Sequence, residues 1–181
     1  MHQVKSSTPS EIAATGFAQA AAARRGPRAK GRPLPVKDTL WTLPGFCGGT
    51  KIATSFGEMP IYALRLRDPL RTVAGTIATV GWVDKIHLDE EFLRTHPDAQ
   101  PILIRAGSLG HNLPKEDLTV SPHQKINVSK AQFRQEFCLA RDLEHMPGVL
   151  RKPEMLLTYY LFNCTVPVTV SVNGTWTSVA P

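Results

Sequence analysis

The most regular pattern in the chain is an alternation of apolar and polar side chains from Val166 to Val172. A period of two places alternate side chains on one face of an extended strand, so this segment is predicted to be a half-buried β-strand. The run is followed by Asn173 and Gly174, a dipeptide typical of a two-residue hairpin turn. The sequence therefore predicts an antiparallel hairpin here.

Short apolar segments separated by turn residues fill much of the preceding sequence, at the spacing of an all-β domain. The predicted strands are Thr50–Thr54, Met59–Leu64, Leu70–Val73, Ile77–Val80, Val83–Leu88, Ile102–Arg105, Leu118–Val120, Ile126–Val128, Phe137–Ala140 and Met155–Phe162. A tight turn at Ser55–Glu58 makes a hairpin of the first two. Within this region, helix is expected as one turn in Asp89–Pro97 and as a short helix at Ala131–Glu136. Because strands do not alternate with long helices, a parallel sheet is not expected and the predicted fold class is all-β, with short antiparallel strands and hairpins.

The first 39 residues have a different composition from the rest. The Ala- and Gln-rich segment Glu11–Arg25 predicts a helix that is marginal by itself. The segment Gly26–Pro35 holds three prolines and two glycines and predicts an extended linker. We therefore predict two parts, a flexible, disordered basic arm over residues 1–39 and a β domain over residues 40–181.

The net charge of +6 belongs mainly to the arm. Residues 1–39 carry seven basic and two acidic side chains, whereas residues 40–181 carry 14 basic and 13 acidic ones. A basic Pro/Gly-rich arm can contact phosphates, a membrane surface or an acidic partner, but solvated tails of this composition are usual. Phe17 is the arm's one aromatic residue available for base stacking, so no nucleic-acid partner is expected, and an unknown protein partner stays open.

The three cysteines, Cys47, Cys138 and Cys164, form no C-x-x-C pair. Neither a disulfide framework nor a metal site is predicted, no cofactor is implied, and Cys138 and Cys164 are expected in the core. No run approaches the roughly 18 apolar residues of a transmembrane segment. The N-terminus lacks the basic-then-apolar order of a signal peptide, so the sequence predicts a cytoplasmic protein or export by a non-classical route.

Two Gly-rich stretches hold the candidate chemistry, and we expect them to lie side by side. Leu43–Thr54 places Cys47 beside two glycines, where a backbone can come close to a side-chain nucleophile. Pro101–Pro122 leads to Ser121 and His123. The first stretch therefore offers Cys47 as a candidate nucleophile, and the second contributes Ser121 and His123 as residues that could act beside it. The alternative is that Cys47 is a small buried apolar residue and His123 a turn residue bonded to the backbone.

The order of these motifs resembles the bacterial branch of the Hint (Hedgehog/intein) domains. The resemblance covers about Leu43 to Val179 and is carried by G-F-C-G-G-T-K-I-A-T, by I-R-A-G-S-L-G…L-P-K-E-D-L-T-V-S-P, by T-Y-Y-L-F-N and by V-N-G-T-W-T-S. It implies a horseshoe-like all-β fold of tightly wound hairpins. It also implies a relationship to proteins that process themselves by acyl transfer, with Cys47, Ser121 and His123 as the candidate catalytic residues if the domain is active.

Members of this family that cleave themselves use a Cys or Ser at the first domain residue to attack the preceding carbonyl. A T-x-x-H motif distorts the bond and protonates the departing nitrogen. The family opening C-F-x-x-G-T aligns with Phe46, Gly49 and Thr50, which puts Gly45 at the nucleophile position and Cys47 two places late.

The second motif also departs from the family pattern. Ser121 stands for the Thr of T-x-x-H, but Gln124 takes the fourth place and His123 lies one place early. On a strand, a shift of one residue turns a side chain to the opposite face. Near the C-terminal side, where relatives tend to have a His after Y-Y-h-L-F-[DN], this chain has Cys164.

Three functional hypotheses follow. The favoured one is a Hint-type domain whose own cleavage has been lost and whose scaffold is used for binding or for a secretion-linked interaction. The alternative is active self-cleavage by an N-to-S acyl shift at Phe46-Cys47. A hydrolase acting on another molecule is the weakest, because no G-x-S-x-G elbow, H-E-x-x-H helix or phosphate loop is present.

Overall fold

The computed structural model describes residues 40–129 and 134–180. The predicted arm, with its helix at Glu11–Arg25 and its linker, lies outside these residues. So does most of the helix predicted at Ala131–Glu136, whose described part, residues 134–136, is not helical. The division into a part before residue 40 and a domain after it stays a prediction.

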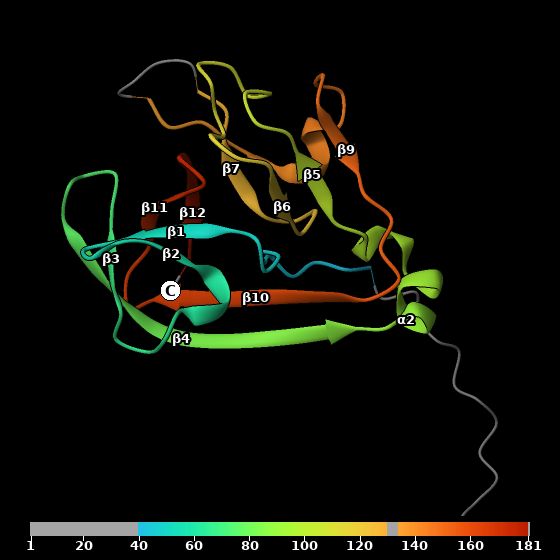
Figure 1. Ribbon diagram of the computed structural model, residues 1–181, viewed down its shortest axis with the longest axis horizontal. Coiled ribbons are helices and arrows are strands. Elements are labelled where there is room, and N and C mark those ends of the chain that lie inside the picture. The colour runs from blue at the N-terminus through green and yellow to red at the C-terminus, as the bar shows by residue number, and fades with distance from the viewer. Residues whose placement is uncertain (1–39, 130–133, 181) are drawn as a thin grey trace, which may run out of the picture. The chain divides into compact units, whose positions relative to one another are not determined.

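The described residues form a β domain, which confirms the predicted all-β class (Figure 1). Its strands are β1 (Lys51–Thr54), β2 (Gly57–Pro60), β3 (Pro69–Arg71), β4 (Ile77–Leu88), β5 (Ile102–Ile104), β6 (Leu118–Val120), β7 (Lys125–Asn127), β8 (Phe137–Leu139), β9 (Val149–Arg151), β10 (Leu157–Cys164), β11 (Val168–Val172) and β12 (Thr175–Val179). The helical elements are α2 (Glu90–Thr95) and three short 3-10 helices, η2 (Ile61–Ala63), η3 (Pro97–Ala99) and η4 (Ala140–Leu143). Helix α2 confirms the predicted helical turn, and the side chain of Asp89 caps it by accepting from the Phe92 N–H.

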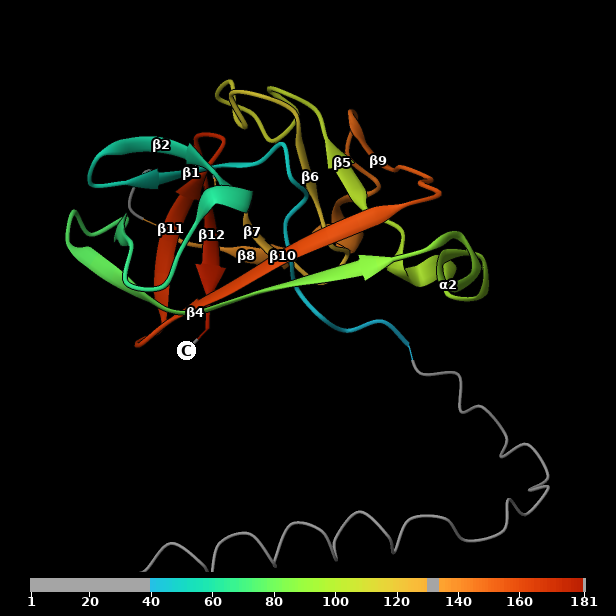
Figure 2. The ribbon, with the colours of Figure 1, turned by 60° about the horizontal axis from the view of Figure 1, so that its bottom comes forward.

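The strands form two antiparallel sheets. One has the order β10-β4-β3-β1-β11-β12-β7-β8, with β2 paired to β1, and the other has the order β6-β5-β9. The long β4 and β10 run as a two-stranded ribbon whose far end reaches α2, and the smaller sheet lies on the other side of β10 (Figure 1 and Figure 2). Strand β10 is an edge of the larger sheet and β6 an edge of the smaller one. The site described below lies between these two edges.

The hairpin predicted from the alternating run is confirmed. Strands β11 and β12 pair in register from Val168 opposite Val179 to Val172 opposite Thr175. The turn residues Asn173 and Gly174 have φ of 44° and 80°, as a type I′ turn requires at both positions. The strand begins at Val168, two residues later than predicted, because Val166 is exposed while Val168, Val170 and Val172 meet the core.

Several predicted strand boundaries differ from the observed ones by one or two residues, as at β10 and β3, and two differences change the structure itself. Strand β2 ends at Pro60, and Ile61–Ala63 is a 3-10 turn that buries Ile61 and Leu64, three residues apart, on one side. Strand β4 runs unbroken where two strands were expected, because its register with β10 shifts between Asn163 and Cys164 and leaves Gly81 as the extra residue. A β-bulge therefore stands where the sequence indicated a break.

The apolar side chains form two buried clusters. The larger one fills the space between the sheets and includes Phe46, Ile52, Val120 and Phe162. The smaller one lies under α2 and contains Trp41, Leu88, Leu93, Ala99, Leu157 and Tyr159. Cys164 belongs to the larger cluster and Cys138 packs against it, as predicted. None of the helices within residues 40–129 and 134–180 has the length and apolar character needed to span a membrane.

Candidate functional site

The two Gly-rich stretches lie side by side, as predicted, through a short extended segment around Phe46. Phe46 bridges Val120 of β6 on one side and Tyr160 of β10 on the other. Its N–H donates to the Tyr160 carbonyl at 3.0 Å, and its carbonyl accepts from the Tyr160 N–H at 2.8 Å. On the β6 side, the Cys47 N–H donates to the Thr119 carbonyl at 3.0 Å. The segment thus joins the edges of the two sheets.

Gln124 contacts the backbone at the position that the resemblance assigns to the nucleophile. Its side-chain oxygen Oε1 accepts a hydrogen bond from the Gly45 N–H at 3.1 Å. Its Nε2 donates to Thr177 Oγ1 at 2.7 Å and has a longer bond, 3.4 Å, to the Ser178 carbonyl. Only 3% of Gln124 is exposed. The fourth residue of the motif therefore faces Gly45, and the amide is fixed at both ends.

Ser121 holds the chain just before Gly45. Its hydroxyl donates to the Leu43 carbonyl and accepts from Trp41 Nε1 at 2.9 Å. The Ser121 N–H donates to the Gly45 carbonyl at 2.9 Å. Together, Ser121 and Gln124 bracket the Pro44-Gly45 peptide bond, which is the bond that the family alignment makes equivalent to the cleaved one.

Trp41 anchors the same segment and was not singled out from the sequence. Its ring stacks on Tyr159, with centroids 5.5 Å apart, and meets Phe92 edge to face at 6.2 Å. Its backbone N–H donates to Asp98 Oδ2. A tryptophan before a motif gives no local signal, so only its partners identify its role.

A close contact with Tyr159 occupies the space next to Gly45. A Cβ atom added at Gly45 would lie 3.1 Å from Tyr159 Cβ and 3.4 Å from its ring. Tyr159 is fully buried, and its hydroxyl donates to the Ala99 carbonyl at 2.9 Å. Burial raises the pKa of this phenol above its usual value, and it stays neutral. The position is packed for glycine.

Cys47 lies in the segment as expected, but its environment does not activate the thiol. Burial, with a smaller contribution from the Glu154 carboxylate, raises the pKa of Cys47 to about 12, and the Lys152 ammonium opposes this only in part. A thiol is nucleophilic as the thiolate. At neutral pH this side chain is a neutral, partly buried thiol that packs against the smaller apolar cluster.

His123 points to a different neighbour from Gln124. Its Nε2 lies 3.2 Å from Arg141 Nη1, which can only donate, so Nε2 is the acceptor. Desolvation first, and then the Arg141 charge, lower the pKa of His123 below its usual value. The imidazole is therefore neutral near pH 7. The catalytic roles assigned to Cys47, Ser121 and His123 stay predictions.

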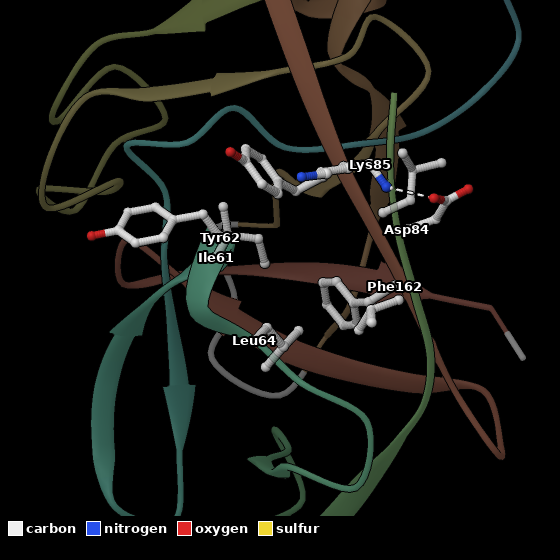
Figure 3. Close-up of a pocket in the computed structure, with 9 residues that line it drawn as sticks. Ile61, Tyr62, Leu64, Asp84, Lys85 and Phe162 are labelled. Atoms are coloured by element: carbon white, nitrogen blue, oxygen red, sulfur yellow. Dashed lines mark hydrogen bonds between the residues drawn. The ribbon is translucent and has the colours of Figure 1, made fainter. Parts of the chain in front are cut away.

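A cavity of about 260 Å³ opens beside the Gly45 backbone, with a mainly apolar lining. Leu43, Trp82 and Gln124 contribute to its wall. A separate cavity of about 290 Å³ lies between η2 and the β4/β10 ribbon, where Ile61, Leu64 and Phe162 point inward and Tyr62 points away (Figure 3). This second cavity contains none of the predicted site residues. In the described part of the chain, no group of His, Cys, Asp and Glu is placed to hold a metal ion.

Comparisons with known proteins point to the same family as the motifs and the fold. The family model described as the Hint domain matches residues 44–179, and the chain therefore belongs to the Hint domain family. A comparison with curated proteins found no significant match.

Solved structures show the same fold. A bacterial intein-like domain from Clostridium thermocellum aligns with a TM-score of 0.52 and 14% identity, covering 77% of this chain and 99% of that domain. A DnaB intein from Synechocystis aligns with a TM-score of 0.51 and 7% identity, covering 77% of this chain and 100% of the intein. These likenesses confirm the Hint fold expected from the motifs.

Proposed function

We propose that this Hint domain has lost self-cleavage and uses the retained scaffold to bind a protein partner. The observation that carries the proposal is the hydrogen bond from the Gly45 N–H to Gln124 Oε1. It joins the two positions that the family uses for the nucleophile and the acid. Gly45 has no side chain and Gln124 carries a neutral amide, so neither residue can take that role.

The missing chemistry can be stated step by step. Acyl transfer needs a side-chain nucleophile directly after the attacked carbonyl, and Gly45 has no side chain. It also needs a proton for the departing nitrogen, and a neutral amide such as Gln124 is not a general acid. Losing a positioned general acid alone costs roughly 10² to 10⁴ in rate. The packing of Tyr159 supports the same conclusion, because a Cβ at position 45 would lie 3.1 Å from Tyr159 Cβ, closer than ordinary van der Waals contact.

The alternative is an N-to-S acyl shift at Phe46-Cys47. Both ends of that peptide bond are held in sheet-like hydrogen bonds, the Phe46 carbonyl by Tyr160 and the Cys47 N–H by Thr119. Attack would have to pull both groups out of these bonds. The raised pKa of the Cys47 thiol and the contact of His123 with Arg141 leave the reaction without a thiolate or a nearby acid. These observations favour a scaffold without cleavage.

The test is incubation of the full-length chain with a strong thiol or with hydroxylamine, both of which open thioesters. We expect no fragment after overnight incubation, and the same result for Cys47→Ala. A fragment that begins at Cys47 in the wild-type chain and is absent from Cys47→Ala would refute the proposal and establish the alternative. A fragment that begins at Gly45 would refute it in a different way, by showing cleavage without the expected nucleophile.

A further inference from the structure

The outer edge of β10 has unpaired main-chain groups next to the Phe46 segment. Tyr160 exchanges both of its backbone bonds with Phe46, so its N–H and carbonyl point away from β4. Backbone groups alternate in direction along a strand, so those of Thr158 point the same way. Thr158 lies opposite His87 of β4, and their side chains bond to each other at 2.8 Å, as a close, non-hydrogen-bonded pair allows. Among the described residues, nothing accepts from or donates to the Thr158 backbone on this side.

The chain that would continue the pairing turns away at this point. The register of Phe46 with Tyr160 would bring Gly48 opposite Thr158, but Cys47–Thr50 closes a turn through a 3.0 Å bond from the Thr50 N–H to the Cys47 carbonyl. Within the described chain, the N–H groups of Gly48 and Gly49 have no acceptor. Gly48, Gly49 and Thr158 line the same opening, so unpaired backbone groups border it from both sides.

This opening is a groove of about 420 Å³ with a polar and partly charged lining. Lys152 and Glu154 neutralise each other at 2.6 Å. Asp117 has no cation within ion-pair distance in the described residues, and its Oδ1 accepts from the Ala106 N–H at 2.9 Å. Leu156, at the start of the edge, is 76% exposed. The groove therefore offers main-chain hydrogen bonds, one unbalanced negative charge and an exposed apolar side chain.

We propose that the groove between Thr158 and the Cys47–Thr50 turn, hereafter the β10 groove, binds an extended peptide segment that carries a Lys or Arg. The peptide pairs its main chain with Thr158 as an added strand, places its basic side chain near Asp117 and packs an apolar side chain on Leu156. Main-chain pairing would satisfy the unpaired backbone groups of Thr158, Gly48 and Gly49, which a small apolar ligand would leave unsatisfied. This inference deepens the binding role in the proposed function and rests on it.

The probe is a phage-displayed library of random octapeptides, selected on the full-length protein. We expect enriched sequences rich in β-branched residues with at least one Lys or Arg. A synthetic peptide from the selection is then measured by fluorescence anisotropy against two matched variants. Thr158→Val and Thr158→Pro both lose the side-chain bond to His87, but only the proline lacks the N–H that faces the groove. Binding should stay within about twofold for the valine variant and weaken roughly tenfold or more for the proline variant.

Two further measurements keep the test independent of how the proline variant folds. N-methylation of the peptide amide that faces Thr158 should weaken binding to the wild-type protein by a similar factor. Asp117→Asn, which retains the acceptor for Ala106, should weaken binding of the basic peptide and reduce its salt dependence. A library with no enriched sequence, or peptides indifferent to both N-methylation and Thr158→Pro, would overturn the inference. None of these readouts involves cleavage. If peptide binding fails these tests, the proposed loss of self-cleavage is unaffected. If the chain is found to cleave itself, that loss is refuted whatever the peptide measurements show.

Discussion

Replacing Gln124 with alanine should destabilise the domain far more than replacing an exposed glutamine. The substitution removes the acceptor for the buried Gly45 N–H and two bonds from Nε2, at 2.7 Å to Thr177 and 3.4 Å to Ser178. A typical intramolecular hydrogen bond contributes about 0.5–1.5 kcal/mol, and a buried donor left without a partner costs about 1–3 kcal/mol. We therefore expect a loss of about 2–4 kcal/mol in the free energy of unfolding.

The assay is urea unfolding followed by tryptophan fluorescence, with Gln135→Ala as the control. Gln135 is exposed, and its Oε1 accepts from Thr169 Oγ1 at 2.8 Å, so its loss should cost less than about 0.5 kcal/mol. The midpoint should fall for Gln124→Ala with little change in slope. Equal midpoints for the two variants would refute the reasoning, because the hydrogen bonds of the Gln124 amide would then contribute nothing to the free energy of unfolding.

Three further predictions concern Trp41, Cys47 and Gly174. Trp41→Ala should lower the free energy of unfolding by about 3–5 kcal/mol in the same urea assay, whereas Trp41→Phe, which keeps a ring on Tyr159 but loses the bond to Ser121, should lose much less. The Cys47 thiol should react with iodoacetamide far more slowly than glutathione at pH 8.5. The pKa of this thiol is raised from 9.0 to about 12 in the folded state, so between pH 9 and 12 the thiol ionises in the unfolded chain but not in the folded one. Its ionisation therefore has no effect on stability below pH 9 and lowers stability as pH rises toward 12. The fall in stability over that range should be shallower in Cys47→Ala. Gly174→Ala should lower the free energy of unfolding by about 1–2 kcal/mol, because residue 174 has a φ of 80°. The added Cβ would also lie 2.6 Å from Lys115 Cγ, which adds a clash. Lys115→Ala should relieve that clash, and a double-mutant cycle measures the coupling.

The parts of the fold predicted correctly are those with a strong local pattern. The alternation before Asn173 predicted β11 and its turn because period and turn chemistry agree there. The short strand β9 was missed, since Val149–Arg151 has no alternation long enough to detect and exists through its pairing with β5. The continuous course of β4 was missed for a similar reason, because the bulge at Gly81 depends on the register of β10.

The sequence predicted which residues lie at the site, but not the contacts between them. The motif register alone put Gly45 and Gln124 at the family's functional positions, and the structure shows them bonded to each other. No pattern in the sequence indicated that Tyr159 would pack closely against the Cβ position of residue 45, or that Trp41 would reach Ser121. Both contacts join residues far apart in the chain, so they follow from tertiary packing.

The central claim is that the chain does not cleave itself, and the mass of the freshly purified full-length protein tests it most directly. The account predicts a single species at the intact mass of 19.9 kDa, with no fragment beginning at Gly45 or at Cys47. A stable fraction of protein whose N-terminus is Cys47, present before any thiol is added, would contradict the account and restore active self-cleavage at Phe46-Cys47.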